Sequence, residues 1–515
     1  MVLHDSHAEI LVIRAFNHWL LEECKSLLEQ RIDSSNREFE SERIEADGAN
    51  DNDKAGTQPT REKLQASTFI NWRHQPGTGP NLASHTLYGI SDTNQLAKTK
   101  LSWPPFELRK DLRIYMYGTC APCGDASMEL CMASQEDPTP WATPPLGASN
   151  NHENPSSGNS SQHNQASNTP HSTTSLLNGR AHFSILGAVR RKPSRADAES
   201  TLSKSCSDKL AVKQVTSLLT FPACLLIGIS SNAYLTALLL PEEEISRVAC
   251  ARAFGGGETG RLAGLNGRRW SNGDSDDDND DADSTAPLDG RMGYAFRPFE
   301  VRPVPTAQVQ EEWAFGKPRD NNGTEVKKKS KPGNISAVWT ATTSSSSSST
   351  MIKGKLATGT NLNETLINGV KQGYRLSSPT PRKASALSRA KMWALLRDIV
   401  QLLPSADNCG GNDGVVAARR TDKFEKQTST TRRALDDIRD NLLFAKIQEC
   451  VLTAQSYEMM KRRCIETGIG PSKVRKDVTT DVRDVLGNWV ENRGDDDWGL
   501  ELLEESSTRK VVERV

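Results

Sequence analysis

The apolar residues of this sequence occur in separate stretches, and long polar runs lie between them. Hydrophobic residues make up only 36% of the 515 positions, which is too few for several compact domains of ordinary size. We therefore expect a single domain over 1–515 that is interrupted by polar, disordered insertions. The polar runs place the insertions at about 33–61, 135–179, 271–285 and 340–351, and the ordered parts at about 1–32, 62–134, 180–270, 286–338, 352–404 and 420–505.

The ordered parts are expected to contain both helices and strands. Residues 8–30 carry apolar side chains at helical spacing and contain no Gly or Pro, which predicts a buried helix. The run LRIYMYG at 112–118 is rich in β-branched and aromatic residues, so it predicts a buried strand that leads through a tight turn into a helix. Further helices are expected to begin near Cys206 and to cover 393–403 and 432–462. These elements indicate an α/β fold.

The net charge of −1 is spread unevenly along the chain. Seven aspartates lie in the run 274–283, so the remainder of the chain carries a net charge of +6. A basic body of this kind is compatible with a polyanionic partner, although an ordinary balanced surface would give the same count.

No segment of the sequence predicts export or membrane insertion. The N-terminus lacks a basic region followed by an apolar one, and the most apolar window, 221–240, is interrupted by Pro222 and by polar residues. The 10 cysteines do not follow the dense spacing of disulfide-rich domains. We expect an intracellular protein of the cytoplasm and/or nucleus, with reduced cysteines and no membrane partner. The sequence does not specify an oligomeric state.

Three short motifs place metal-binding side chains at expected helix starts. His7-Ala8-Glu9 begins the first helix, Pro122-Cys123-Gly124 follows the strand at 112–118, and Cys206 begins another helix. The pKa of a cysteine is lowered at a helix N-terminus, which favours the thiolate that binds metals. One histidine, two cysteines and a water would form a four-coordinate zinc site with an open position. Glu9 would then transfer protons in a hydrolytic deamination.

Taken singly, the motifs leave the ligand set open. A nucleobase deaminase signature would have a second cysteine three residues after Cys123, where this chain has Ala126. Cys120 has the spacing of a metal-binding pair with Cys123, but a cysteine at the end of a strand is more often part of the core. A lone His-x-Glu is also common on helix surfaces.

In their order along the chain, the motifs HAE, PCGDAS and SCSDK resemble those of the adenosine deaminases that act on RNA and tRNA. The resemblance extends through 388–393 and 488–491, and other segments look like the tRNA-acting branch, particularly its fungal members. It implies a cytidine-deaminase-like fold with three α/β/α layers, a central mixed sheet and additional C-terminal helices. It also implies a tRNA partner and conversion of adenosine to inosine next to the anticodon of an alanine tRNA.

The same resemblance implies roles for individual residues. His7, Cys123 and Cys206 would hold the zinc, a water on this zinc would attack adenine C6, and Glu9 would be the proton shuttle. Family members also bury an inositol hexakisphosphate beneath the active site, held by basic side chains. The positions that match or could replace its contacts are Arg14, Lys209, Lys213, Lys391, Tyr457, Lys461 and Trp489. For any one of these lysines, a solvated helix face is an equally simple interpretation.

Basic residues around the expected pocket are candidates for RNA contact. The candidates are Arg190, Arg191, Lys192 and Arg195. Contacts of such residues with phosphates position a nucleic acid without reading its sequence. A second basic stretch at 327–331 borders low-complexity sequence, which favours a flexible tail there.

The chain departs from the family pattern at its N-terminus. Only six residues precede His7, whereas a deaminase fold normally has a helix and two strands of its sheet in this place. Without those strands the sheet would have an unpaired edge, so we expect that the N-terminus is truncated. Two alternative functions therefore stay open: a catalytically inactive, zinc-containing RNA-binding or scaffold protein, and a cytidine deaminase of the same fold.

Overall fold

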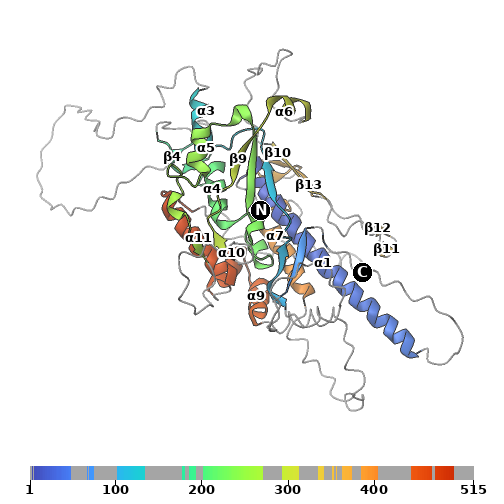
Figure 1. Ribbon diagram of the computed structural model, residues 1–515. Coiled ribbons are helices and arrows are strands. Elements are labelled where there is room, and N and C mark those ends of the chain that lie inside the picture. Colours follow the sequence, from blue (N-terminus) through green and yellow to red (C-terminus); the bar gives the residue numbers. More distant parts are fainter. Residues whose placement is uncertain are drawn as a thin grey trace, which may run out of the picture.

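The computed structural model of the protein (Figure 1) describes residues 3, 5–47, 67, 69–74, 101–133, 177–179, 185–192, 201–270, 293–312, 335–341, 351–352, 355–356, 362–373, 384–403, 442–466 and 470–491. Several expected ordered parts, such as 75–100 and 193–200, lie outside the described residues, and so does the expected acidic insertion at 271–285.

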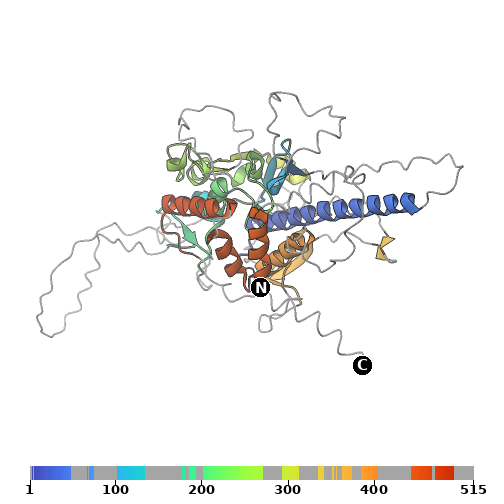
Figure 2. The ribbon, with the colours of Figure 1, turned by 90° about the horizontal axis from the view of Figure 1, so that it is seen from below.

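The first helix, α1, is Ala8–Asp47. Its first half packs into the core, where Leu20, Leu21 and Leu28 are fully buried. Its second half extends beyond the other helices and strands (Figures 1 and 2). The expected insertion from residue 33 was therefore wrong as far as residue 47. Residues 31–47 contain several Glu and Arg and no Gly or Pro, and this composition favours a helix even where no apolar stripe is present.

The central sheet consists of three strands in the order β3 (Ile114–Tyr117), β6 (Leu235–Pro241) and β9 (Glu300–Val304). All three are parallel, with Met116, Leu238 and Val301 in one row. This row faces a core cluster to which α1, α4 (Cys206–Thr216) and α5 (Arg247–Phe254) contribute. The expected α/β class is confirmed. The sheet was expected to be mixed, whereas its described strands are all parallel.

Two short helical turns follow β3. They are η1 (Asp125–Ser127) and α3 (Met128–Ala133), where a single helix start had been expected. The backbone N–H of Met128 donates to the carbonyl of Asp125, which joins the two turns. The turn between β3 and η1 therefore lies at the carboxyl end of a parallel strand, where α/β proteins commonly place their functional side chains.

Smaller sheets surround this unit. The antiparallel pairs are β1 (Ile70–His74) with β2 (Leu101–Leu108), β7 (Arg269–Trp270) with β8 (Tyr294–Ala295), and β11 (Met351–Ile352) with β12 (Lys355–Leu356). A three-stranded antiparallel sheet contains β10 (Ile335–Trp339), β13 (Asn363–Ile367) and β14 (Val370–Lys371). The strands β4 (Leu177–Asn178) and β5 (Arg190–Arg191) are parallel, so residues 177–178 of the expected insertion are part of the fold. The remaining short helices are η3 (Ala223–Leu225), η4 (Ser231–Ala233), η5 (Glu242–Glu244), η6 (Ala263–Leu265) and α6 (Thr306–Glu312).

The largest core lies between α1, α4 and the C-terminal helices. These helices are α7 (Arg389–Leu402), α9 (Leu442–Thr453), α10 (Tyr457–Glu466) and α11 (Gly470–Leu486). Within the segment 432–462 that was expected to be helical, α9 ends at Thr453 and α10 begins at Tyr457, where the Ser456 hydroxyl accepts a hydrogen bond from the N–H of Met459 at 3.1 Å. Residues 432–441 lie outside the described residues. No helix in the described part of the chain is both long and apolar enough to cross a bilayer.

Trp393 of α7 is the residue through which this core can be tested. Its side chain is fully buried, and its indole N–H donates to the carbonyl of Val451 in α9 at 3.3 Å. Trp393→Ala should lower the free energy of unfolding by about 3–5 kcal/mol in urea denaturation, because it leaves a large cavity. Trp339→Ala is the matched control: Trp339 is 64% exposed, so its loss should change the free energy by no more than about 0.5 kcal/mol. Equal effects of the two substitutions would contradict this description of the core.

Candidate metal centre

His7 is held in place by the first turn of α1. Its carbonyl accepts hydrogen bonds from the N–H groups of Ile10 and Leu11 at 3.0 and 2.9 Å. Its own N–H donates to the carboxylate of Asp5 at 3.2 Å. The Ser336 hydroxyl of β10 donates to the carbonyl of Ser6 at 2.7 Å. The residue therefore has a defined backbone position although it lies near the N-terminus of the chain.

Cys123 and Cys206 lie on two turns that interlock. The N–H of Ser207 donates to the carbonyl of Cys123 at 3.0 Å, and the Ser207 hydroxyl accepts from the N–H of Ala126 at 3.1 Å. Gly124 has a φ of +103°, and a side chain at this position would collide with Ser205. The close approach of the two turns therefore requires glycine at position 124.

Cys206 is the first residue of α4. Ser205 is the N-cap of this helix, because its hydroxyl accepts from the N–H of Asp208 at 3.2 Å. The N–H of Cys206 donates to the Cys123 sulfur at 3.3 Å. The Cys123 sulfur thus accepts a backbone hydrogen bond at the N-terminus of α4, where the helix dipole is positive. Both the hydrogen bond and the dipole stabilise a thiolate.

His7, Cys123 and Cys206 form one group in which all potential ligand atoms lie within 4.8 Å of one another. The Nδ1 atom of His7 is 3.6 Å from the Cys123 sulfur and 3.5 Å from the Cys206 sulfur. Nitrogen and sulfur atoms bound to one tetrahedral zinc at about 2.1 and 2.3 Å lie about 3.6 Å apart. The donor set and its spacing therefore fit zinc. Cys120 is exposed and is not part of this group, so the alternative ligand pair is not formed.

The three side chains of this group shift one another's pKa values. The hydrogen bond with Cys206 lowers the pKa of Cys123 well below its usual value, and His7 lowers it further. The hydrogen bond with Cys123, burial and the negative charge at Cys123 in turn raise the pKa of Cys206 well above its usual value. The hydrogen bond with Cys123 raises the pKa of His7. The arrangement thus stabilises one thiolate even before a cation is considered.

A buried ammonium group lies directly behind the cysteines. Lys192 Nζ is 3.2 Å from the Cys206 sulfur and 2.9 Å from both carboxylate oxygens of Asp5. Burial opposes the charge of Lys192, but the negative charges of the cysteines and Asp5 outweigh it and raise its pKa. Lys209 also contacts Asp5, at the carboxylate oxygen Oδ2 that Lys192 shares. Burial would raise the pKa of Asp5, but the two lysines outweigh this effect and lower it.

The basic residues expected to contact RNA are not all available at the surface. Arg190 is only 1% exposed, and its guanidinium donates to the carbonyls of Gly179 and Ile185 at 3.3 and 2.5 Å. Lys192 is also buried and is paired with Asp5. Both residues nevertheless line a small cavity beside the metal-binding group, so their contact with RNA stays a prediction. Arg191 is half-buried, and Arg195 lies outside the described residues, so their contact with RNA stays a prediction.

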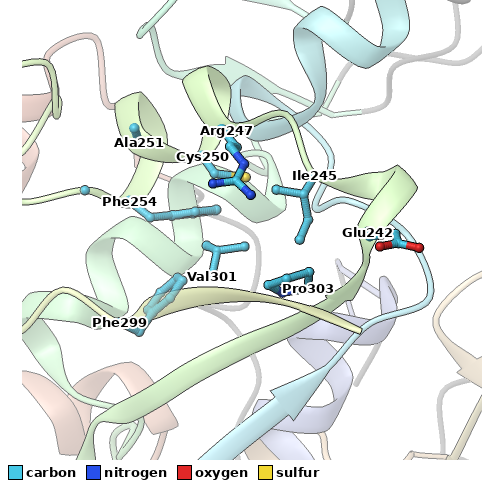
Figure 3. Close-up of a pocket in the computed structure, with 10 residues that line it drawn as sticks. Glu242, Ile245, Arg247, Cys250, Ala251, Phe254, Phe299, Val301 and Pro303 are labelled. Atoms are coloured by element: carbon cyan, nitrogen blue, oxygen red, sulfur yellow. The ribbon is translucent and has the colours of Figure 1, made fainter. Parts of the chain in front are cut away.

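A cavity of about 40 Å³ adjoins the metal-binding group. Its lining includes His7, Cys123, Ser127, Arg191 and Lys192. A larger cavity of about 430 Å³ lies between α5 and β9 (Figure 3). Apolar side chains such as Phe254, Phe299 and Val301 line it, and no member of the metal-binding group does. Of these two cavities, the small one is therefore the one that belongs to the candidate active site.

A third cavity, of about 460 Å³, is rich in cations. Six basic and two acidic side chains line it: Lys204, Lys209, Arg389, Lys461, Arg462, Arg483, Glu458 and Glu491. Trp489 also lines it, and its ring lies 5.5 Å from Lys204 Nζ. Burial and the charges of Lys209 and Arg483 lower the pKa of Lys204 to about 8. This cavity thus holds an excess of positive charge that the surrounding carboxylates do not neutralise.

Three of the seven residues expected to hold an inositol phosphate, Lys209, Lys461 and Trp489, line this cation-rich cavity. Lys213 lies one turn beyond Lys209, where burial and the charges of Arg475 and Arg14 lower its pKa well below the usual value. The other three lie in the adjoining helices: Arg14 donates to the carbonyl of Leu387, Tyr457 donates to that of Phe221, and Lys391 lies in the first turn of α7.

Sequence reasoning missed several residues of these two sites. Asp5 lies two positions before His7, and Lys204 two positions before Cys206, so a closer inspection of the motif flanks could have identified both. Arg389 and Arg483 have no local signal, because their role depends on helices that pack together from distant parts of the chain.

The fold and the site define a class of protein: an α/β domain whose histidine and two cysteines, beside helix starts, are arranged so that they could hold a metal ion. Residues 88–254 match the family model of the adenosine-deaminase (editase) domain. This part of the chain is therefore similar to the adenosine-deaminase (editase) domain. Cys123 and Cys206 lie inside the matched region, whereas His7 and Glu9 precede it, so it is the geometry that joins them to the two cysteines.

Two curated relatives are similar to parts of this chain. The tRNA-specific adenosine deaminase 1 of Schizosaccharomyces pombe is 30% identical over 254 residues, which cover 49% of this chain and 42% of the relative. The tRNA-specific adenosine deaminase 1 of Saccharomyces cerevisiae is 32% identical over 114 residues, or 22% of this chain and 24% of the relative. The chain thus matches less than half of the length of either relative.

The metal site can be tested with two cysteine variants. Cys123→Ser should raise the dissociation constant for zinc by at least about 100-fold, because even the loss of a residue that supports a metal ligand costs 10–100-fold. Cys120→Ser is the matched control, and its affinity should equal that of the wild type, since Cys120 is exposed and outside the group. Competition with a chromophoric chelator measures both constants. Loss of zinc from the Cys120 variant alone would contradict the assigned ligands.

Proposed function

We propose that this protein deaminates adenosine to inosine in tRNA by zinc-dependent hydrolysis. The observation that carries the proposal is the convergence of His7, Cys123 and Cys206, which are remote in the sequence, at distances that suit one zinc ion. The adenosine-deaminase domain match supports adenine as the base. The names of the two fungal relatives support tRNA as the substrate.

Each residue of the site has a role in this proposal. His7, Cys123 and Cys206 would hold the zinc, which lowers the pKa of a bound water so that it is ionised near neutral pH. Glu9 is half-buried in the first turn of α1, and its negative charge contributes to the raised pKa of Cys206, so its carboxylate lies near the ligands. Glu9 would accept one proton from the water and pass it to the adenine ring nitrogen as the oxygen adds to C6. It would then take the proton of the new C6 hydroxyl and deliver it to the amine, which leaves C6 as ammonia.

The finer substrate assignment rests on the family resemblance. We propose the adenosine next to the anticodon of an alanine tRNA, as in the tRNA-acting branch of the family. Because a tRNA substrate is intracellular and the described cysteines are free thiols, we also propose that the protein acts in the cytoplasm and/or the nucleus.

We further propose that the cation-rich cavity binds inositol hexakisphosphate. Six basic side chains and two acidic ones line the cavity, and Asp5 pairs with Lys209. Lys213, one helical turn beyond Lys209, adds a further basic side chain that Arg475 repels. Buried cations that repel one another are costly unless an anion compensates them. A ligand with many phosphate groups provides this compensation, and Asp5 would connect its site with the metal centre through Lys209 and Lys192.

Glu9→Gln tests the proposed chemistry. The amide cannot accept the proton, so the variant should lose at least about 100-fold in the rate of inosine formation on bulk tRNA while it retains zinc. Glu29→Gln is the control, because Glu29 also lies on α1 but is 52% exposed and pairs only with Lys25. Full activity of the Glu9 variant would remove Glu9 from the mechanism. Zinc without inosine in the wild type would support the scaffold alternative, and uridine in place of inosine would support a cytidine deaminase.

Inositol hexakisphosphate should stabilise the protein through the cation-rich cavity. Added at about 100 times its dissociation constant, it should raise the free energy of unfolding by about 2.7 kcal/mol, which calorimetry detects as a higher Tm. Arg389→Met with Lys461→Met should abolish this shift. Lys476→Met, which removes an exposed lysine of α11, should preserve it. Phosphorus analysis of the purified protein establishes whether the ligand is already bound, and a chain without phosphorus and without a Tm shift would contradict the proposal.

A further inference from the structure

Each of the two cysteines at the metal centre is followed, two residues later, by a buried aspartate. Asp125 follows Cys123, and Asp208 follows Cys206. Both aspartate side chains are 0% exposed. A carboxylate at such a position requires hydrogen bonds and a cationic partner, and both aspartates receive them from the same two segments of the chain.

Asp125 is bound by Arg252 of α5. The Nε atom of Arg252 is 3.0 Å from each carboxylate oxygen of Asp125, and Nη2 donates to the carbonyl of the same residue at 3.1 Å. The guanidinium also pairs with Glu129 at 2.6 and 3.0 Å. The N–H of Gly187 donates to Asp125 at 2.7 Å. The Arg252 side chain therefore contacts both the carboxylate and the backbone carbonyl of Asp125, in the turn that carries Cys123.

Asp208 is bound in the same manner by Arg261. Nη1 of Arg261 is 2.6 Å from one carboxylate oxygen. The other oxygen accepts from the N–H of Arg190 at 3.0 Å and from the Ser205 hydroxyl at 2.5 Å. Each aspartate thus has one arginine from 252–261 and one backbone N–H from 185–191.

The two arginines belong to one rigid segment. The N–H of Arg261 donates to the carbonyl of Arg252 at 3.0 Å, and Nε of Arg261 donates to the carbonyl of Ala253 at 3.3 Å. Gly260 closes the intervening turn, and a side chain there would collide with the carbonyl of Gly255. A displacement of either arginine would therefore be passed to the other.

We propose that Arg252 and Arg261 are positioning residues that set the distance between Cys123 and Cys206. This inference rests on the proposed function, because it assumes that the two cysteines hold a metal. The interlock through Ser207 joins the turns on one side, and the linked arginines join them on the other. Metal ligands must be held within about 0.5 Å of the productive geometry. The pairs Arg252–Asp125 and Arg261–Asp208, which we call the clamp, lie two residues from each cysteine and provide this control.

The geometry of the ion pairs favours positioning over simple stabilisation. A buried ion pair often contributes little net free energy, because the desolvation of both charges opposes their attraction. A guanidinium that contacts several acceptors in fixed directions does, however, define where those acceptors lie. Lysine at the same position would keep the positive charge and lose this directionality. An Arg→Lys variant therefore separates a role in positioning the cysteines from a role in stabilising the fold.

The test compares Arg252→Lys and Arg261→Lys with Arg268→Lys. Arg268 is the matched control, because its side chain is 50% exposed and pairs with Asp481 outside the clamp. Two readouts do not depend on activity: the dissociation constant for zinc, and the visible absorption bands of the Co²⁺-substituted protein, which report ligand geometry. Each clamp variant should bind zinc about 10–100-fold more weakly and show altered Co²⁺ bands. On tRNA, its kcat should fall while KM stays the same, and the control should match the wild type throughout.

Linkage between the arginines gives a second expectation. The double variant should weaken zinc binding by less than the product of the two single effects, since the loss of one arginine already releases the other. If a single variant does not fold, Asp208→Asn combined with Arg261→Gln removes both charges of one pair, and the same two readouts apply.

The outcomes distinguish the clamp from the proposed function. Folded clamp variants with wild-type zinc affinity and unchanged Co²⁺ bands would overturn the clamp. A wild type with the expected metal properties but no inosine formation would overturn only the deaminase proposal. A wild type that binds neither zinc nor Co²⁺ would overturn both.

Discussion

The contact between the start of α4 and the turn after β3 is the constraint on which the rest of the site depends. Ser207 bonds to the backbone of this turn through both its N–H and its hydroxyl, and Gly124 permits the approach. Backbone hydrogen bonds are directional, so the contact defines where the two sulfur atoms lie before any cation binds. His7 is placed by α1 together with the hydrogen bonds from its N–H to Asp5 and from Ser336 of β10 to Ser6, and the buried first half of the helix adds rigidity.

A series of ion pairs connects the metal centre with the cation-rich cavity. The positive charge of Lys192 compensates negative charge at the cysteines. Lys192 also forms an ion pair with Asp5, and Asp5 forms a second ion pair with Lys209. The series ends at a cavity where basic side chains outnumber acidic ones. Buried ions need partners, and this series would be completed by the proposed zinc at one end and the proposed inositol hexakisphosphate at the other. The metal centre and the cation-rich cavity are therefore parts of a single electrostatic unit.

Much of the candidate site could be predicted from the sequence, because its signals are local. His7 and Cys206 stand beside helix starts with recognisable flanks, and the order of the motifs resembles one family. The extent of α1 was underestimated, since the end of the apolar stripe was taken as the end of the helix. Arg252 and Arg261 could not be found, because nothing in their sequence neighbourhood distinguishes them from the other arginines of the chain. Their importance arises from contacts with residues at least 53 positions away.

Local chemistry was enough to establish the residue types of the site, the starts of its helices and the resemblance to one family, because capping, helix propensity and motif spacing act over a few residues. The close approach of Cys206 to His7 and Cys123, the burial of Arg190 and the pairing of two arginines with two aspartates came from packing. These features depend on which segments meet in space. That meeting is decided by the burial of apolar surface over the whole chain, so no short stretch of sequence contains it.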